Sequence, residues 1–189
     1  MSDTPTLDLT GKLLIAMPGM ADPRFVKSVI LVCAHSAEGA MGLIVNKPTG
    51  DITLHDLLAQ LGIASTHPAH SAVHFGGPVE QGRGFVLHSP DYAAADTTLP
   101  VQPRIGLTAT LDVLERIAAG TGPERVLVAL GYAGWGPGQL EAELAENAWL
   151  TCDSMAELVF DADNPGKWQS ALASMGIDAL ALSPEAGRA

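Results

Sequence analysis

Residues 28–45 of this chain read SVILVCAHSAEGAMGLIV, and this stretch decides the class of fold. Its two ends, 28–34 and 40–45, are apolar and contain β-branched residues, a composition typical of buried strands. The HSAEG segment between them consists mainly of residues that favour turns. The stretch therefore predicts an antiparallel hairpin whose two strands are buried on both faces.

Downstream of the hairpin, helical and extended patterns follow one another. Thr53 is expected to cap a short helix that ends at Gly62, and Thr110 to cap a second helix over 111–119. A third helix is predicted over 139–148, and a last one is expected to begin at Asn164-Pro165 and to end at Gly176. Strands are predicted at 72–75, 84–88, 105–107 and 125–130, whereas 155–160 fits either a strand or a turn.

The order of these elements favours an α+β fold in one domain over 1–189. Strands come in pairs in the first half, and helices alternate with strands in the second half, which fits α+β better than a doubly wound parallel sheet. The 189 residues are 47% hydrophobic and 16% charged, enough apolar surface for one core and too little charge for a disordered chain.

The charge balance disfavours a nucleic-acid-binding protein. Ten Lys and Arg face 21 Asp and Glu, a net charge of −11, and the basic residues are scattered from Lys12 to Arg188. Such a chain repels the phosphate backbone that supplies most non-specific affinity. We therefore expect no direct binding to nucleic acid.

The N-terminus and the cysteines predict a soluble, cytoplasmic protein. Residues 1–9, MSDTPTLDL, carry acidic side chains where a secretory signal carries positive charge, and no apolar run is long enough to cross a bilayer. Cys33 and Cys152 lie far apart and form neither a disulfide framework nor a zinc motif. We expect a reducing compartment, no structural disulfide and no contact with membranes.

The strongest candidate for a ligand site is residues 131–141, GYAGWGPGQLE, in which 131–138 are expected to form a loop that leads from a strand into the helix beginning at Gln139. Glycines let backbone amides approach a ligand, and a helix N-terminus attracts anions. The segment lacks the GKS or GKT ending of a P-loop, and Glu141 already complements the helix dipole. The alternative is a tight architectural turn in which Trp135 is buried as a plug.

A second candidate is the turn at Phe75-Gly76-Gly77-Pro78, which is followed by Arg83. It can place a guanidinium beside exposed amides, an arrangement suited to a carboxylate or phosphate. The structural alternative is a turn whose glycines serve only unusual backbone angles.

Other residue clusters predict less. His67, His70 and His74 match no metal motif, so no metal site is expected. His88, Ser89 and Asp91 are the residue types of a hydrolase triad, but neighbours on a strand point to opposite faces and no GxSxG elbow is present. We therefore predict no catalytic residue, no metal and no cofactor.

Four segments together resemble the AlgH/YqgE family of bacterial proteins. They are residues 11–48 (GKLLIAMPGMADPRFVKSVILVCAHSAEGAMGLIVNKP), 75–89 (FGGPVEQGRGFVLHS), 131–144 (GYAGWGPGQLEAEL) and 147–150 (NAWL), in the expected order. The closing KWQSALASMGID also fits. His67, His70 and Cys152 fall outside the recognisable pattern, which weakens the metal hypothesis further.

The resemblance implies an α+β fold with a bifurcated mixed β-sheet that includes a small barrel, surrounded by helices. It implies no established catalytic residue. The family is described as regulating the transcription of alginate genes, and the acidic charge favours an indirect form of such a role.

Two functional hypotheses remain open at this point. The first is a non-catalytic binding or regulatory protein that recognises a protein partner or a small anionic ligand. The second is an enzyme or a nucleotide-binding protein that uses the glycine-rich loops. The missing nucleophile and metal constellation favours the first, and the concentration of glycines and polar side chains in three loops favours the second. The most useful single observation is whether those three loops converge on one concave pocket. The candidate ligand-binding residues are His35, Asn46, Gly76, Gly77, Arg83, His88, Tyr132, Gly134, Trp135, Gly136 and Gly138.

Overall fold

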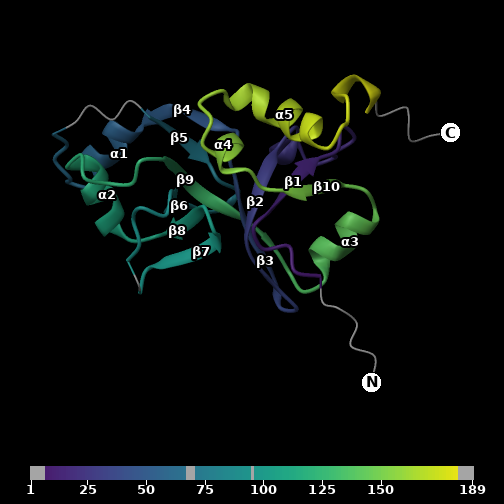
Figure 1. The fold of residues 1–189 in the computed structure, drawn as a ribbon, viewed down its shortest axis with the longest axis horizontal. Coiled ribbons are helices and arrows are strands. Elements are labelled where there is room, and N and C mark those ends of the chain that lie inside the picture. Colours follow the sequence, from purple (N-terminus) through teal and green to yellow (C-terminus); the bar gives the residue numbers. More distant parts are fainter. Residues whose placement is uncertain (1–6, 67–70, 95, 183–189) are drawn as a thin grey trace.

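The computed structural model describes residues 7–66, 71–94 and 96–182, which form an α+β fold (Figure 1). The strands are β1 (Lys12–Ala16), β2 (Val29–Ser36), β3 (Gly39–Ile44), β4 (Pro48–Thr53), β5 (Ala72–Phe75), β6 (Val79–His88), β7 (Thr98–Gln102), β8 (Ile105–Thr108), β9 (Val126–Trp135) and β10 (Trp149–Asp153). The α-helices are α1 (Leu54–Gln60), α2 (Leu111–Ala118), α3 (Gln139–Ala145), α4 (Ala156–Val159) and α5 (Lys167–Ser174).

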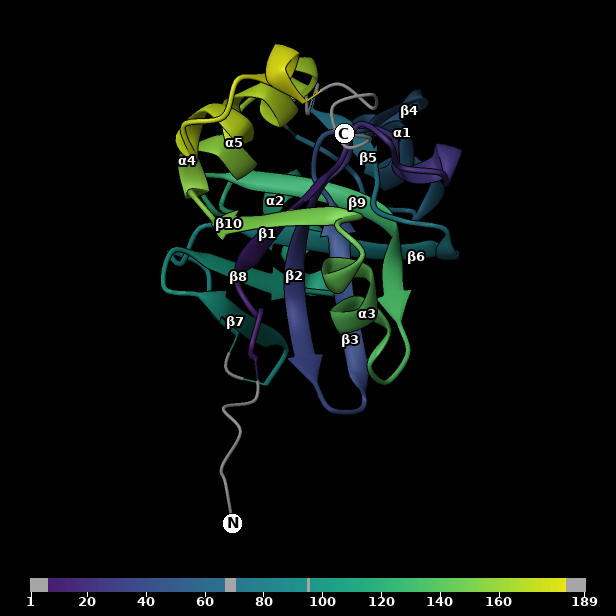
Figure 2. The same cartoon turned by 90° about the vertical axis from the view of Figure 1, so that its right-hand side faces the viewer.

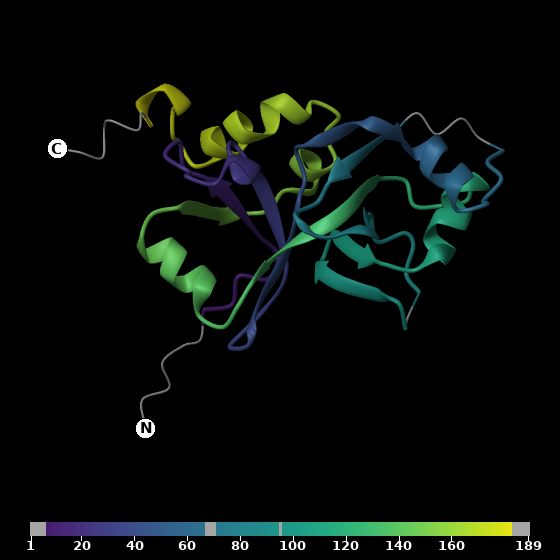
Figure 3. The same ribbon diagram turned by 180° about the vertical axis from the view of Figure 1, so that it is seen from behind.

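The sheet is mixed and forks at β9. Its main path runs β10-β1-β2-β3-β9-β6-β8-β7, and β4 and β5 branch from it. One edge of β9 pairs with β6, while the other edge pairs first with β5, in parallel, and then with β3. In Figure 3, β9 crosses the molecule and links its two halves. The predicted bifurcated sheet is confirmed.

Gly76 occupies the fork between β3 and β9. Its N–H donates to the Leu130 carbonyl at 2.8 Å, and its carbonyl accepts from Ile44 N–H at 2.9 Å. A Cβ on Gly76 would lie 2.3 Å from the Gly131 carbonyl oxygen, closer than any real contact. A glycine at this position is therefore required by backbone packing, because any side chain would force the two strands apart.

The sheet curls into a half-barrel whose two end regions meet through close contacts. Gln102 at the end of β7 donates to Ser154 Oγ, just beyond β10, at 2.7 Å. A Cβ on Gly11, just before β1, would lie 2.9 Å from the Val101 carbonyl oxygen of β7. The largest core cluster fills the interior with residues from β1, β2, β3, β6, β7, β8 and β9. Figure 2 shows the curl, with the β2–β3 hairpin projecting from it.

The helices cover separate faces of this sheet. α1 and α2 pack with Val73, Val86 and Val128 in one cluster, and α3 packs against the Trp135 and Trp149 side of the sheet. α5 closes the half-barrel, where Trp168 Nε1 donates to the Ala16 carbonyl at 2.9 Å. No helix in the described ranges is long and apolar enough to cross a lipid bilayer.

Several predicted elements agree with the structure. The hairpin over 28–45 is formed by β2 and β3, and a reciprocal capping box between Thr53 and Asp56 begins α1 as expected. Thr110 occupies the N-cap position of α2, although its side chain bonds Asp112 rather than a backbone N–H.

Other predictions were wrong. Residues 131–135 continue β9 instead of forming a loop, and β6 begins at Val79, within the expected turn. Most of residues 155–160 is neither strand nor turn, because 156–159 form the short helix α4, which buries Ala156, Leu158 and Val159. The predictions also missed strands β1, β4 and β7.

Cys33 is expected to be chemically inert in the folded protein. It is fully buried in β2, and burial raises the pKa of its thiol to about 12. Because the thiolate is the reactive form, a thiol reagent at pH 8 should leave Cys33 unmodified until the chain is unfolded. Peptide mass mapping after native and denaturing alkylation checks this. Equal labelling of Cys33 in both samples would contradict the expectation.

Stability is expected to rise between about pH 8 and pH 10.5 because of Lys167. This side chain is 2% exposed, and its Nζ donates to the carbonyls of Val45 and Val159 at 2.7 and 2.9 Å. Burial lowers the Lys167 pKa from 10.5 to about 8. The unfolded chain therefore binds more protons in that window, so the free energy of unfolding increases with pH. A neutral amine still has two N–H groups for the two carbonyls.

The measurement compares the wild type with Lys167→Met, in which nothing titrates at this position. Denaturant unfolding from pH 7 to pH 10.5 should show the wild type gaining about 1–3 kcal/mol relative to the variant. A difference that stays constant with pH would contradict this account.

Candidate functional site

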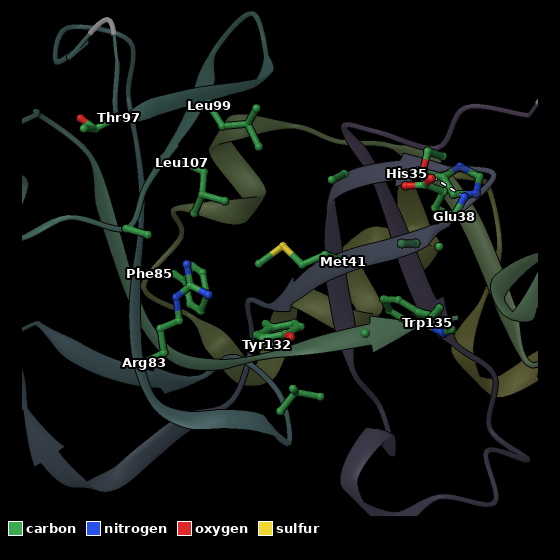
Figure 4. Close-up of a pocket in the computed structure, with 17 residues that line it drawn as sticks. His35, Glu38, Met41, Arg83, Phe85, Thr97, Leu99, Leu107, Tyr132 and Trp135 are labelled. Atoms are coloured by element: carbon green, nitrogen blue, oxygen red, sulfur yellow. Dashed lines mark hydrogen bonds between the residues drawn. The ribbon is translucent and has the colours of Figure 1, made fainter. Parts of the chain in front are cut away.

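A cleft of about 830 Å³ opens at the mouth of the half-barrel (Figure 4). The β2–β3 hairpin forms one wall, and β6, β7 and β8 form the other. Tyr132 and Gly134 of β9 lie between the two walls. Mouths of barrels are common positions for binding sites, because the sheet holds the walls apart.

Most of the lining is apolar and continuous with the core. Met41 and Tyr132 are partly buried against the largest core cluster, while Leu99 and Val79 remain 46% and 36% exposed. The Phe85 and Tyr132 rings meet edge to face at 5.9 Å. The apolar lining residues are Ala34, Ala40, Met41, Val79, Phe85, Leu99, Leu107, Ala109, Tyr132 and Trp135.

Arg83 supplies positive charge on the β6 side of the cleft. The pairing of β6 with β9 shifts register between Val79 and Gly84, a bulge in which Glu80 adopts a φ of 47°. The Arg83 guanidinium lies 5.1 Å from the centre of the Phe85 ring. Its ion pair with Glu80 is 3.3 Å long and exposed, so it is worth little and leaves the charge available to a ligand.

His35 fixes the opposite wall. Its Nδ1 accepts from Leu9 N–H at 3.0 Å, so that nitrogen carries no proton and Nε2–H donates to Glu141 at 2.6 Å. The imidazole thereby joins the segment before β1 to the hairpin and to α3. The pKa of the Glu141 carboxyl is lowered by a hydrogen bond from the backbone N–H of Glu141 itself and by the hydrogen bond from the His35 side chain.

Trp135 is buried, as predicted, with 7% of its surface exposed. Its ring meets that of Trp149 edge to face at 6.2 Å. The turn that follows offers little to an anion, because Gly136 N–H already donates to Gln139 Oε1 at 3.0 Å. α3 has seven residues and Glu141 in its first turn, which opposes a bound anion.

The structure brings some of the predicted residues together and separates others. His35, Arg83, Tyr132, Gly134 and Trp135 line the cleft, so parts of all three predicted segments converge. The remaining candidates lie outside this lining and are Asn46, Gly76, Gly77, His88, Gly136 and Gly138.

Two of these outlying residues have structural partners. Asn46 accepts from Val29 N–H at 3.0 Å and donates to the Lys27 carbonyl at 2.8 Å. His88 is fully buried, with Thr108 Oγ1 2.8 Å from its Nε2. Its Nδ1 faces the Ser89 carbonyl oxygen rather than the Ser89 hydroxyl, so the two side chains form no catalytic pair.

Of the three histidines considered as metal ligands, only His74 belongs to the described residues. His67 and His70 lie outside the described residues. His74 is buried, with Asn164 Oδ1 3.1 Å from its Nε2 and the Val128 carbonyl 3.3 Å from its Nδ1. Within the described ranges no group of His, Cys, Asp and Glu side chains is arranged to hold a metal ion.

Sequence reasoning missed most of the apolar lining of the cleft. Met41, Phe85 and Leu107 occupy strand positions that equally suit a closed core, and Leu99 lies in a strand that was not predicted. The one available signal was Arg83, a charged residue two positions before the aromatic Phe85 on which it stacks.

Comparisons of sequence and of structure with known proteins point to the same family. A family model described as AlgH-like matches residues 13–180. UPF0301 proteins from Cereibacter sphaeroides and Jannaschia sp. are 56% and 58% identical, each match covering 97% of this chain and at least 97% of the relative. The solution structure of the AlgH protein from Pseudomonas aeruginosa is 42% identical over 100% of both chains, with a TM-score of 0.78. A crystal structure from Corynebacterium diphtheriae, 22% identical over 87% of this chain and 85% of that one, shares the fold with a TM-score of 0.71.

Proposed function

This chain belongs to the AlgH-like family, and from that premise we propose that it is a non-catalytic binding protein whose cleft holds an extended apolar segment of another polypeptide. The observation that carries the proposal is the apolar lining of the cleft, where Leu99 and Val79 stay 46% and 36% exposed. Each Å² of apolar surface left in water costs about 25 cal/mol, so covering this lining favours binding.

The polar groups of the cleft support binding rather than catalysis. Both nitrogens of His35 are engaged, by Leu9 N–H and by Glu141, so His35 is not free to act as a base. Ser36 Oγ accepts from Glu38 N–H at 3.1 Å, which ties that hydroxyl to the hairpin turn. Within the described lining of the cleft, the His35 imidazole and the Ser36 hydroxyl therefore do not form a pair of base and nucleophile.

A regulatory role would then act through the bound polypeptide. The net charge of −11 opposes direct contact with DNA, so an effect on transcription would require a partner that itself reaches the DNA or the transcription machinery. Capture of an apolar segment gives the chain a means of altering such a partner.

The test is a titration of the purified chain into a fluorescent peptide with blocked ends, whose Leu-Phe-Val-Leu core is flanked by glutamines. Leu99→Asp places a charge in the cleft and should weaken binding at least about tenfold, since burying an unpaired carboxylate is costly. Leu180→Asp is the matched control, because Leu180 is 90% exposed and lies outside the cleft. Equal affinity of both variants would contradict the proposal.

The competing small-ligand hypothesis is tested with the same protein. Nucleotides and phosphorylated metabolites should leave the melting temperature unchanged, because the turn before α3 has its Gly136 amide engaged. A clear rise in melting temperature with one of them, together with no peptide binding, would replace the polypeptide by an anionic small ligand.

A further inference from the structure

We propose that the cleft selects segments whose apolar core is flanked by an acidic residue on one side and a basic residue on the other. This inference rests on the proposed function, since it specifies the charges of the polypeptide that the cleft would hold. The acidic residue would meet Arg83, and the basic residue would meet Glu38. In Figure 4 these two side chains lie at opposite ends of the cleft, with Met41 between them.

The Arg83 end is suited to a carboxylate. The guanidinium is held beside the apolar wall by its contact with Phe85, and its side chain is 57% exposed. Glu80, its partner at 3.3 Å, is itself 54% exposed, so the pair is easily exchanged for a better one. A carboxylate that enters from the cleft can accept two parallel N–H bonds from a guanidinium, a geometry that a single long contact lacks.

The Glu38 end is suited to a cation. Glu38 lies in the turn of the β2–β3 hairpin, where its backbone N–H donates to Ser36 Oγ. No ion pair within the described ranges involves its carboxylate. His35 in the same wall is neutral, because its Nδ1 accepts from Leu9 N–H while its Nε2–H donates to Glu141. It therefore adds no positive charge that would offset the Glu38 carboxylate. This end of the cleft is therefore anionic.

The two charged ends favour a polypeptide over a single-headed amphiphile. A fatty acid with its carboxylate at Arg83 would direct its tail toward Glu38. There the apolar tail gains no favourable contact, and the Glu38 carboxylate loses water. An extended segment places side chains of opposite charge at both ends and apolar side chains between them.

The experiment uses one apolar core with four pairs of flanking residues, namely Glu and Lys, Glu and Glu, Lys and Lys, and Gln and Gln. Wild-type protein should bind the Glu and Lys peptide about fivefold more tightly than the Glu and Glu peptide or the Lys and Lys peptide. Arg83→Glu should make the Lys and Lys peptide the tightest ligand, and Glu38→Lys should make the Glu and Glu peptide the tightest. The controls Arg116→Glu and Glu115→Lys change the net charge equally, on the exposed face of α2.

The outcomes separate the two proposals. If all four peptides bind equally and the reversals change nothing, the charge selection is overturned while the proposed function stands. If the Arg116 and Glu115 controls shift the ranking as much as the cleft reversals, only the overall charge matters and the selection is also overturned. If none of the four peptides binds, both proposals fall.

Discussion

Gly77→Ala is expected to destabilise the fold by more than about 4 kcal/mol, and the variant should be recovered largely unfolded. A Cβ at this position would lie 2.0 Å from the Tyr132 carbonyl carbon and 2.3 Å from Ala133 N. These are backbone atoms of β9, so no side chain can move to relieve the overlap. Urea unfolding followed by circular dichroism measures the loss.

Gly82→Ala is the matched control for this prediction. Gly82 lies on β6 only a few residues further along, and a Cβ there would meet no atom within 4 Å. Its stability should stay within about 0.5 kcal/mol of the wild type. Comparable stability of the Gly77 and Gly82 variants would mean that the segment does not pack against β9 as described.

Trp135→Ala is expected to destabilise the fold by about 3–5 kcal/mol, the usual cost of emptying a large aromatic site. Trp135 is 7% exposed and its ring lies 6.2 Å from that of Trp149, in the cluster on which α3 packs. Thermal and denaturant unfolding measure the effect. The predicted loss arises from packing and is independent of any ligand.

Gly138→Ala provides the comparison within the same segment. A Cβ there meets open space, but the φ of 72° is unfavourable for alanine, so the expected loss is about 1–2 kcal/mol. A Trp135 variant as stable as the Gly138 variant would contradict an architectural role. A ligand-induced rise in melting temperature that disappears in folded Gly138→Ala protein would instead support an anion site at this turn.

Local sequence pattern was sufficient for the central elements of the fold. β2 and β3 have uninterrupted apolar runs, and α1 has both a capping residue and leucines at helical spacing, so these elements need no long-range information. β7 was not predicted because Pro100 interrupts it and Val101 is its one buried residue, which leaves no alternation to detect.

The glycines of residues 131–135 misled the prediction for a physical reason. Glycine usually marks a loop, but here Gly131 allows the close approach of Gly77, whose carbonyl oxygen would lie 2.3 Å from a Cβ at position 131. Strand β9 can therefore continue past a glycine because another backbone packs against it. That partner lies about fifty residues earlier in the chain, beyond the reach of a local pattern.

The candidate site was predictable only in part. His35, Arg83 and Tyr132 stood out as functional residue types, and the structure places all three along the cleft. The apolar wall depends on how far the sheet curls, which is set by contacts such as Gln102 with Ser154. A half-exposed leucine and a core leucine look the same in sequence, so Leu99 gave no signal.

The most direct test of the binding proposal is to map the Glu- and Lys-flanked peptide onto the isotopically labelled chain by amide chemical-shift changes. The account predicts that the changes concentrate in residues 36–41, 79–85 and 132–134, which surround the cleft. It also predicts that they vanish in Leu99→Asp and persist in Leu180→Asp. Changes centred instead on α1 and α2, or none at saturating peptide, would contradict the claim that the cleft is the binding site.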